Sequence, residues 1–128
     1  MPKLIPGALA CICILSFGCA LHAQPPYAPT ATSCLKPFYD PANYNWYAYS
    51  NNCTDKLHVT WVSRDGNHSG TLDIRPERSA NIGFDADEVS KMNGVEAYAC
   101  PEHYYAVDAI DRNVTKPVAA FRCKYQGY

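Results

Sequence analysis

The sequence has no excess of charge of either sign. Its 128 residues include 11 Lys and Arg against 12 Asp and Glu, which leaves a formal net charge of -1. Proteins that hold nucleic acid or an anionic membrane surface by electrostatics need a basic patch, and this balance does not indicate one. We therefore expect no nucleic acid among its partners.

The sequence also lacks the common catalytic and metal-binding motifs. It contains no Gly-x-Ser-x-Gly elbow, no phosphate-binding glycine loop, no His-Glu-x-x-His helix and no Cys-x-x-Cys pair. His58, His68 and His103 are not placed beside a serine or cysteine nucleophile. We expect no cofactor, no metal and no catalytic residues. The alternative is a small hydrolase, which would need a cleft where a histidine and a carboxylate converge. The acids Asp73, Glu96, Asp108 and Asp111 could also pair with one another as acid and base, although isolated acids on a small β-protein usually form a solvated face.

A long apolar run is missing as well. The longest apolar stretch near the start, residues 4–15, is short for a membrane span and is interrupted by Pro6. It follows a basic residue and precedes small residues before Gln24, which is typical of a secretory signal peptide. We expect residues 1–23 to be a signal peptide, the mature chain to have no transmembrane span, and the protein to be secreted or periplasmic. A retained anchor and lipidation at Cys19 are the alternatives.

Four cysteines remain beyond this leader: Cys34, Cys53, Cys100 and Cys123. An even number of cysteines in a small exported domain predicts two disulfides. Three pairings are possible, and we favour Cys34 with Cys53 and Cys100 with Cys123 because each pair brackets one compact segment. The cysteine spacing argues against a zinc site.

The clearest structural signal is an alternating strand over residues 57–62, which follows a polar turn. Leu57, Val59 and Trp61 fall on one face, and His58, Thr60 and Val62 fall on the other. We place the first three side chains in the core and expect the other face to point away from it.

Similar patterns recur along the chain. We expect strands over residues 46–49, 71–74, 79–84, 95–100, 104–110 and 118–125. Asp85 and Glu88 form a capping-box pattern, so a short helix should lie within residues 85–94. These elements predict an all-β fold: a small antiparallel β-sandwich or barrel with one short inserted helix.

The start of the mature chain has a different composition. Residues 24–33 are rich in proline and small residues, which predicts a flexible linker. Residues 34–45 carry many turn-forming residues and are expected to be irregular. A single disulfide-stapled β-domain should therefore span residues 34–128.

Aromatic residues give the main functional indication. Several of them fall within a dozen residues, and the candidate binding residues among them are Tyr44, Trp46, Tyr47 and Tyr49. On a strand, Trp46 points opposite to Tyr47 and Tyr49, so part of this set should be exposed. Exposed aromatic rings suit stacking on sugars or anchoring of a protein partner. The alternative is that these rings only cover the rim of a small core.

We therefore expect an exported, non-enzymatic binding module whose partner is a glycan or an envelope or extracellular protein. A secreted inhibitor of a hydrolase is the alternative from another class. It would present one rigid loop, for which residues 64–70 and 101–105 are the candidates.

Several short segments together resemble a known group of proteins. They are the turn Asn51-Asn52-Cys53, the segments Leu72-Asp73-Ile74 and Tyr98-Ala99-Cys100-Pro101, and residues 116–124. This order resembles small exported bacterial proteins of unknown function that share a two-disulfide β-domain, over residues 34–124. The resemblance implies export and fold only. The turn is also similar to the first strands of thaumatin-like proteins, which carry many more cysteines.

Overall fold

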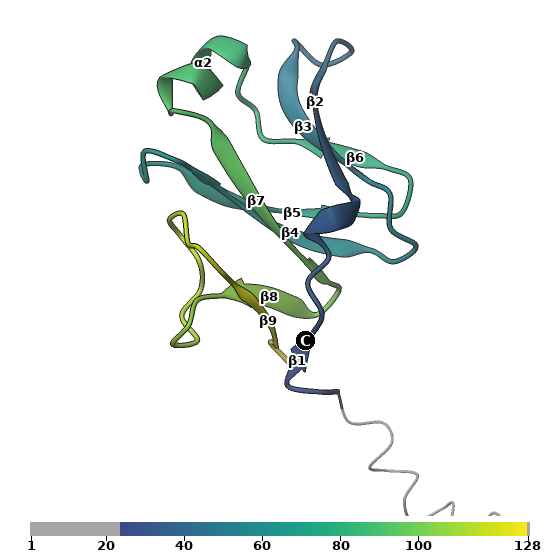
Figure 1. Ribbon diagram of the computed structural model, residues 1–128. Helices are drawn as coiled ribbons and strands as arrows, with labels where there is room; N and C mark the ends of the chain where they lie inside the picture. The colour runs from purple at the N-terminus through teal and green to yellow at the C-terminus, as the bar shows by residue number, and fades with distance from the viewer. Residues whose placement is uncertain (1–23, 128) are drawn as a thin grey trace, which may run out of the picture.

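The computed structural model describes residues 24–127, which fold into three antiparallel sheets with a single α-helix among them (Figure 1). The expected signal peptide, residues 1–23, lies outside the described residues. The predicted fold class, all-β with one short helix and two disulfides, is confirmed.

The middle sheet is organised around β4 (Leu57–Ser63), which pairs with β5 (Ser69–Ile74) on one side and β7 (Val95–Pro101) on the other. Both pairings are antiparallel and run along the whole of β4. All seven residues of β4 are buried. A strand buried along its entire length must be covered on both faces.

The first face of the middle sheet is covered by a sheet of β2 (Leu35–Asp40), β3 (Trp46–Asn51) and β6 (Ser79–Asn81) (Figure 1). Leu57, Val59 and Trp61 lie in the core between these sheets and are 1, 0 and 7% exposed, as predicted. We call this the upper core.

The second face is covered by a sheet of β8 (Tyr104–Val107), β9 (Arg122–Tyr125) and β1 (Tyr27–Ala28). Val62 packs here with Tyr98, Tyr104 and Ala106 in a lower core. His58 and Thr60 also point this way and are 8 and 7% exposed. The expectation that this face points away from the core was wrong. Alternation shows that the two faces of a strand differ in chemistry, but it does not show that one of them meets water.

The helix α2 (Ala86–Lys91) begins at the predicted capping box. The Asp85 carboxylate accepts a hydrogen bond from the Glu88 backbone N–H at 3.0 Å, and the Glu88 carboxylate accepts one from the Asp85 N–H at 2.9 Å. These bonds satisfy two donors that a helix start otherwise leaves unpaired. Val89 is the helix residue that is buried.

Two segments contain more regular structure than the sequence indicated. Strand β2 lies in the segment predicted to be irregular and contains Pro37. Proline is tolerated there because β2 is an edge strand, where a missing N–H donor costs little. The segment predicted to be a linker contains β1, which pairs with β9, and the 3-10 helix η1 (Thr32–Cys34).

Both disulfides have the favoured pairing. Cys34–Cys53 joins the start of β2 to the turn after β3. Cys100–Cys123 joins β7 to β9, and both of its cysteines are fully buried in the lower core. The second disulfide thus links the middle sheet to the sheet that covers its lower face.

Candidate functional site

The β2–β3 turn is held in one conformation by Asp40. Its carboxylate accepts hydrogen bonds from the Ala42 N–H at 3.0 Å and from the Asn43 side-chain amide at 2.8 Å. Its backbone carbonyl accepts from the N–H groups of Asn43 and Asn45. Tyr44 and Asn45 have left-handed backbones, with φ of 53° and 57°. The turn therefore presents the Tyr44 ring from a fixed backbone.

The four candidate aromatic residues do not form one surface. Tyr44 is 80% exposed, and its ring lies against the partly buried Trp46, with ring centroids 4.9 Å apart. Tyr49 is 4% exposed and belongs to the upper core. Tyr47 lies between these extremes and meets Tyr49 edge-on at 5.3 Å. Burial raises the pKa of the Tyr47 and Tyr49 hydroxyls. Tyr44 and Trp46 are in contact with each other, and we call them the hairpin aromatic pair.

A second aromatic contact lies on the other face of the same hairpin. Tyr39, which is 41% exposed, is directly opposite Tyr47 in the β2–β3 pairing, and their ring centroids are 5.1 Å apart. Trp46 is opposite Asp40 and therefore points to the other side. Tyr39 offers an exposed ring on the same hairpin that is separate from the hairpin aromatic pair.

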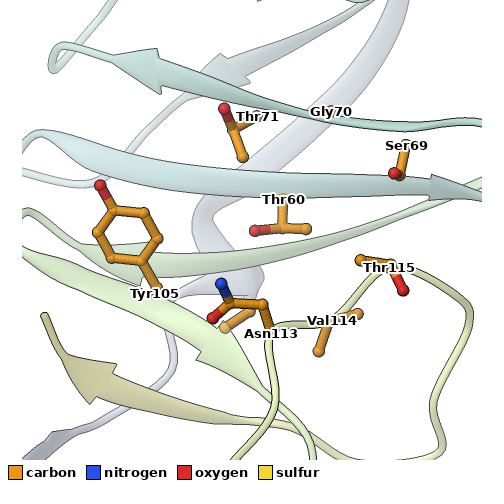
Figure 2. Close-up of a pocket in the computed structure, with 9 residues that line it drawn as sticks. Thr60, Ser69, Gly70, Thr71, Tyr105, Asn113, Val114 and Thr115 are labelled. Carbon is orange, nitrogen blue, oxygen red and sulfur yellow. The ribbon is translucent and has the colours of Figure 1, made fainter.

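A cavity of about 220 Å³ opens between the middle sheet and the segment after β8 (Figure 2). Its polar lining residues are Thr60, Ser69, Thr71, Tyr105, Asn113 and Thr115. We call this cavity the hydroxyl pocket. Figure 2 shows Thr60 and Thr71 on neighbouring strands, with the Tyr105 ring and the Asn113 amide facing the same space. Sequence reasoning missed this site, because its residues are far apart in the chain and share no motif.

The hydroxyl pocket forms because the chain folds back after β8. Asn113 makes an isolated bridge with Val107, and the Val114 N–H donates to the Ala106 carbonyl at 3.2 Å. The Val114 side chain enters the lower core and is 4% exposed. This anchoring places Asn113 and Thr115 opposite the exposed edge of the β4–β5 hairpin.

A histidine and a carboxylate meet in a second cavity of about 190 Å³. His58 Nδ1 lies 2.9 Å from Asp73 Oδ1, and the His58 ring packs on Tyr105 with centroids 4.0 Å apart. His58 Nε2 is buried and has no hydrogen-bond partner among the described residues. The pair is the convergence that a hydrolase would require. However, the nitrogen that would act as a base is covered, so this geometry does not present a base to a substrate.

The loop over residues 64–70 is fixed at both ends. Its Asp65 carboxylate accepts from Ser63 Oγ and from the Asn67 N–H, and the Ser63 hydrogen bond is the main cause that lowers the pKa of Asp65. The backbone N–H groups of Arg64 and Asp65 donate to the Gly94 and Met92 carbonyls. The second candidate loop, residues 101–105, is a tight turn in which His103 has φ of 76°.

Residues 24–127 contain no group of three or more His, Cys, Asp or Glu side chains that could hold a metal ion. The same part of the chain contains no helix with the length and apolar character needed to cross a bilayer.

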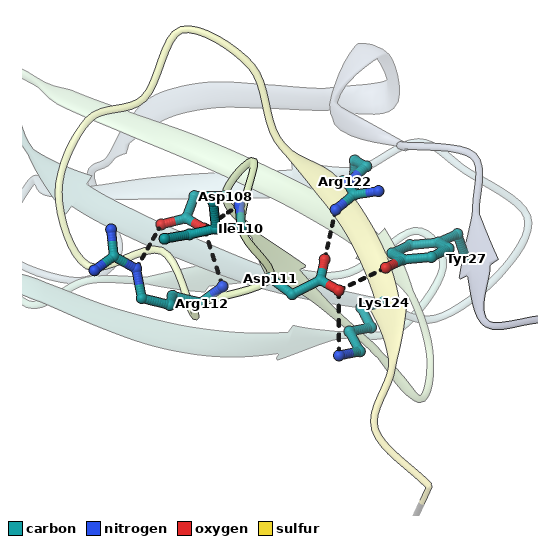
Figure 3. Close-up of polar contacts among 7 residues, drawn as sticks. All are labelled: Tyr27, Asp108, Ile110, Asp111, Arg112, Arg122 and Lys124. Atoms are coloured by element: carbon teal, nitrogen blue, oxygen red, sulfur yellow. Dashed lines mark hydrogen bonds and ion pairs between the residues drawn. The ribbon is translucent and has the colours of Figure 1, made fainter.

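Asp111 ties the N-terminal strand to the C-terminal strand (Figure 3). Its carboxylate accepts a hydrogen bond from the Tyr27 hydroxyl at 2.7 Å and pairs with Arg122 at 2.6 Å and Lys124 at 3.4 Å. Arg122 also lies over the Tyr27 ring, 4.5 Å from its centroid. The Tyr27 hydrogen bond is the main cause that lowers the pKa of Asp111 and raises the pKa of Tyr27.

We expect the β1–β9 pairing to weaken in acid. Because the Asp111 pKa is lower in the folded state, its stabilising contribution is complete above the ordinary carboxyl pKa of about 4 and is lost as the pH falls below it. Amide hydrogen-exchange protection of Ala28 and Tyr125 should therefore be kept at about pH 5 and should fall as the pH drops below about 4. The Asp111→Asn variant lacks the carboxylate charge at every pH, so these two amides should show low protection already at about pH 6.

The matched control is Asp108→Asn in the same turn. Asp108 accepts from the Ile110 and Arg112 N–H groups but makes no contact with β1 in the described structure. Equal loss of protection in both variants would show that the turn as a whole, and not the Asp111 contacts, holds β1.

No family model matches this chain, and neither the curated proteins nor the solved structures contain a significant match. We therefore infer function from the geometry of the hairpin aromatic pair and the hydroxyl pocket. The two disulfides are compatible with an extracellular or periplasmic location, where such bonds persist.

Proposed function

We propose that this chain is an exported binding module that holds a glycan on the hairpin aromatic pair. The observation that carries the proposal is the Tyr44 ring, which is 80% exposed and in tilted contact with the Trp46 ring at the tip of a hairpin. A large ring exposed to water forgoes the stabilisation that burial would give it. Its flat face can instead stack on the C–H face of a sugar ring, and its hydroxyl can bond to a sugar hydroxyl.

The turn supports this role because it lowers the cost of binding. A ligand that must order a mobile loop loses affinity to conformational entropy, whereas a preformed contact surface avoids that loss. The Asp40 hydrogen bonds fix the turn before any ligand arrives. Tyrosine adds few rotatable bonds, so little more freedom is lost at the contact.

Export supports a role outside the cytoplasm. The leader pattern in residues 1–23 and the two disulfides both fit a protein that works beyond the inner or plasma membrane, where surface and matrix polysaccharides are found. A glycan ligand also suits a domain without a strongly charged surface, since neutral sugars are recognised by stacking and hydrogen bonds.

Affinity electrophoresis in gels containing immobilised polysaccharides tests the proposal. We expect retardation of the wild-type protein by at least one polysaccharide, and a loss of affinity of about 10-fold in Tyr44→Ala and in Trp46→Ala, because removal of a stacked ring costs about 1–2 kcal/mol. The exposed Tyr44 contributes little to the core, so Tyr44→Ala should unfold at the wild-type denaturant concentration.

Tyr39→Ala is the matched control. It removes a partly exposed ring from the opposite face of the same hairpin and should leave retardation unchanged. Retardation of Tyr44→Ala and Trp46→Ala that equals that of the wild type would overturn the proposal. Loss in all three variants would indicate that the fold of the hairpin, and not the Tyr44 surface, is required.

A further inference from the structure

We propose that the hydroxyl pocket and the neighbouring cavity at His58 and Asp73 form one site for a small hydroxylated amine, such as a single amino-sugar residue. This site is separate from the hairpin aromatic pair and does not depend on it. It is formed by the lower face of the β4–β5 hairpin together with β8 and the segment that follows β8.

The two cavities lie next to each other along the sheet. Thr60 is directly opposite Thr71, and His58 is directly opposite Asp73, with one residue pair between them in the β4–β5 ladder. Residues two apart on a strand point to the same face, which puts both pairs on one side. Tyr105 lines both cavities and packs on His58. One ligand can therefore reach from the hydroxyl pocket to Asp73 along the Tyr105 ring.

The hydroxyl pocket, which forms one end of this site, suits a ligand with several hydroxyl groups. The Thr60 side chain is largely buried at the base of the pocket, with the residue 7% exposed. The side chains of Thr60, Thr71 and Asn113 have no side-chain hydrogen-bond partner in the part of the chain that the structure describes, so their polar groups can bond to a ligand. The remaining wall is carbon, from threonine methyl groups, Val114 and the Tyr105 ring. Sugars present this combination of hydroxyls and C–H faces.

The size of the hydroxyl pocket limits the ligand. Its volume is about 220 Å³, below the roughly 300–1,000 Å³ of pockets that enclose drug-sized molecules. One sugar ring, and not a long oligomer, is the scale of ligand that the pocket accepts.

The other end carries acidic side chains. Glu102 pairs with Lys56 at 3.4 Å, and Asp73 Oδ1 lies 2.9 Å from Nδ1 of the His58 imidazole. His103 lines the same cavity. The Asp73 side chain is 63% exposed, so a ligand can reach its carboxylate. A ligand ammonium group can pair with it there and gain a charge-assisted hydrogen bond.

The same charge selects against other ligands. A sugar with a carboxylate in place of the amine would meet Asp73 as a like charge, which disfavours binding. A neutral sugar would keep the hydroxyl contacts but lose the ion pair. The site should therefore rank ligands in the order amine, neutral, acid.

NMR titration of the full mature chain with three probes tests this ranking: glucosamine, glucose and glucuronic acid. We expect glucosamine to shift the backbone amide signals of Thr60, Thr71 and Asn113 and to bind about 3- to 5-fold more tightly than glucose, since its ammonium group pairs with a carboxylate that is largely exposed to solvent. Asp73→Asn, which keeps the shape of the side chain, should reduce glucosamine binding to the level of glucose.

Thr71→Val tests the other end of the site. It replaces an exposed hydroxyl by a methyl group on the edge strand β5, and it should weaken glucosamine and glucose by the same factor. Tyr44→Ala should change neither, because it lies in the hairpin aromatic pair. Equal affinity for glucosamine and glucose in the wild type, no effect of Asp73→Asn, or no shift at these amides would overturn the inference. Each of these results is independent of whether polysaccharides bind the hairpin aromatic pair.

Discussion

Replacement of both Cys100 and Cys123 by alanine is expected to lower the free energy of unfolding by about 3–5 kcal/mol. The disulfide closes a loop with a sequence separation of 23, for which lost chain entropy alone accounts for about 3 kcal/mol. Both cysteines are fully buried, so their removal also leaves unfilled space in the lower core. A domain of this size has a total stability of about 5–15 kcal/mol, so much of it would be lost.

The Cys34–Cys53 disulfide provides the comparison. Its sequence separation of 19 gives a similar entropic contribution, but both of its cysteines are only partly buried. The Cys34→Ala, Cys53→Ala variant should therefore lose less, about 2–3 kcal/mol. Urea unfolding monitored by tryptophan fluorescence would give both values. A greater loss for the Cys34–Cys53 variant would contradict the importance assigned to burial in the lower core.

Trp61→Ala is the second change with a large expected effect, a loss of about 3–5 kcal/mol. Trp61 is 7% exposed in the upper core and meets Phe84 edge-on, with ring centroids 5.9 Å apart. Gly70 lies directly opposite it in the β4–β5 pairing. A Cβ atom at Gly70 would lie 2.7 Å from Trp61 Nε1, so the glycine provides the space that the indole occupies.

Gly70→Ala tests the same contact from the other strand. In the wild-type background, the added methyl group should cost about 1–3 kcal/mol, because the indole must move within a packed core. In a Trp61→Phe background, the smaller ring leaves room, and the cost of Gly70→Ala should fall to less than about 1 kcal/mol. Denaturant unfolding of the four proteins gives this cycle. An equal cost of Gly70→Ala in both backgrounds would show that the glycine is required for its backbone and not for the indole.

Local sequence patterns were sufficient to predict much of the fold. The alternation of Leu57, Val59 and Trp61 identified a buried face, and Asp85 with Glu88 identified the start of the helix. The disulfide pairing followed from the separation of the cysteines. Each of these signals depends on residues that are close in the sequence or on a chain short enough to close a simple loop.

The features that were not predicted depend on contacts between distant segments. Strand β2 contains Pro37, and only its position at a sheet edge makes that residue acceptable. Burial of His58 requires β8, which arrives more than forty residues later. Tyr49 and Tyr44 are both tyrosines of one aromatic segment, but Tyr49 packs in the upper core against the middle sheet and Tyr44 lies on a turn. Residue type alone cannot separate these outcomes.

The candidate sites show the same limit. Alternation of Trp46 with Tyr47 and Tyr49 predicted that part of the aromatic segment would be exposed, whereas the exposed Tyr44 lies on the turn before β3. The hydroxyl pocket combines β4, β5 and the segment after β8, and its threonines are common residues without a motif. The β4–β5 register pairs Thr60 with Thr71, and the bridge between Asn113 and Val107 brings Asn113 to the same space.

Strand β4 is shared by the upper and lower cores, and this sharing affects how the domain unfolds. Each core uses alternate side chains of the same seven residues, so neither can open while β4 stays in place for the other. We therefore expect the two halves to melt together, in a single cooperative transition, and the amides of β4 to exchange with solvent only through that global event. A domain with two separate apolar interiors thus behaves as one unit.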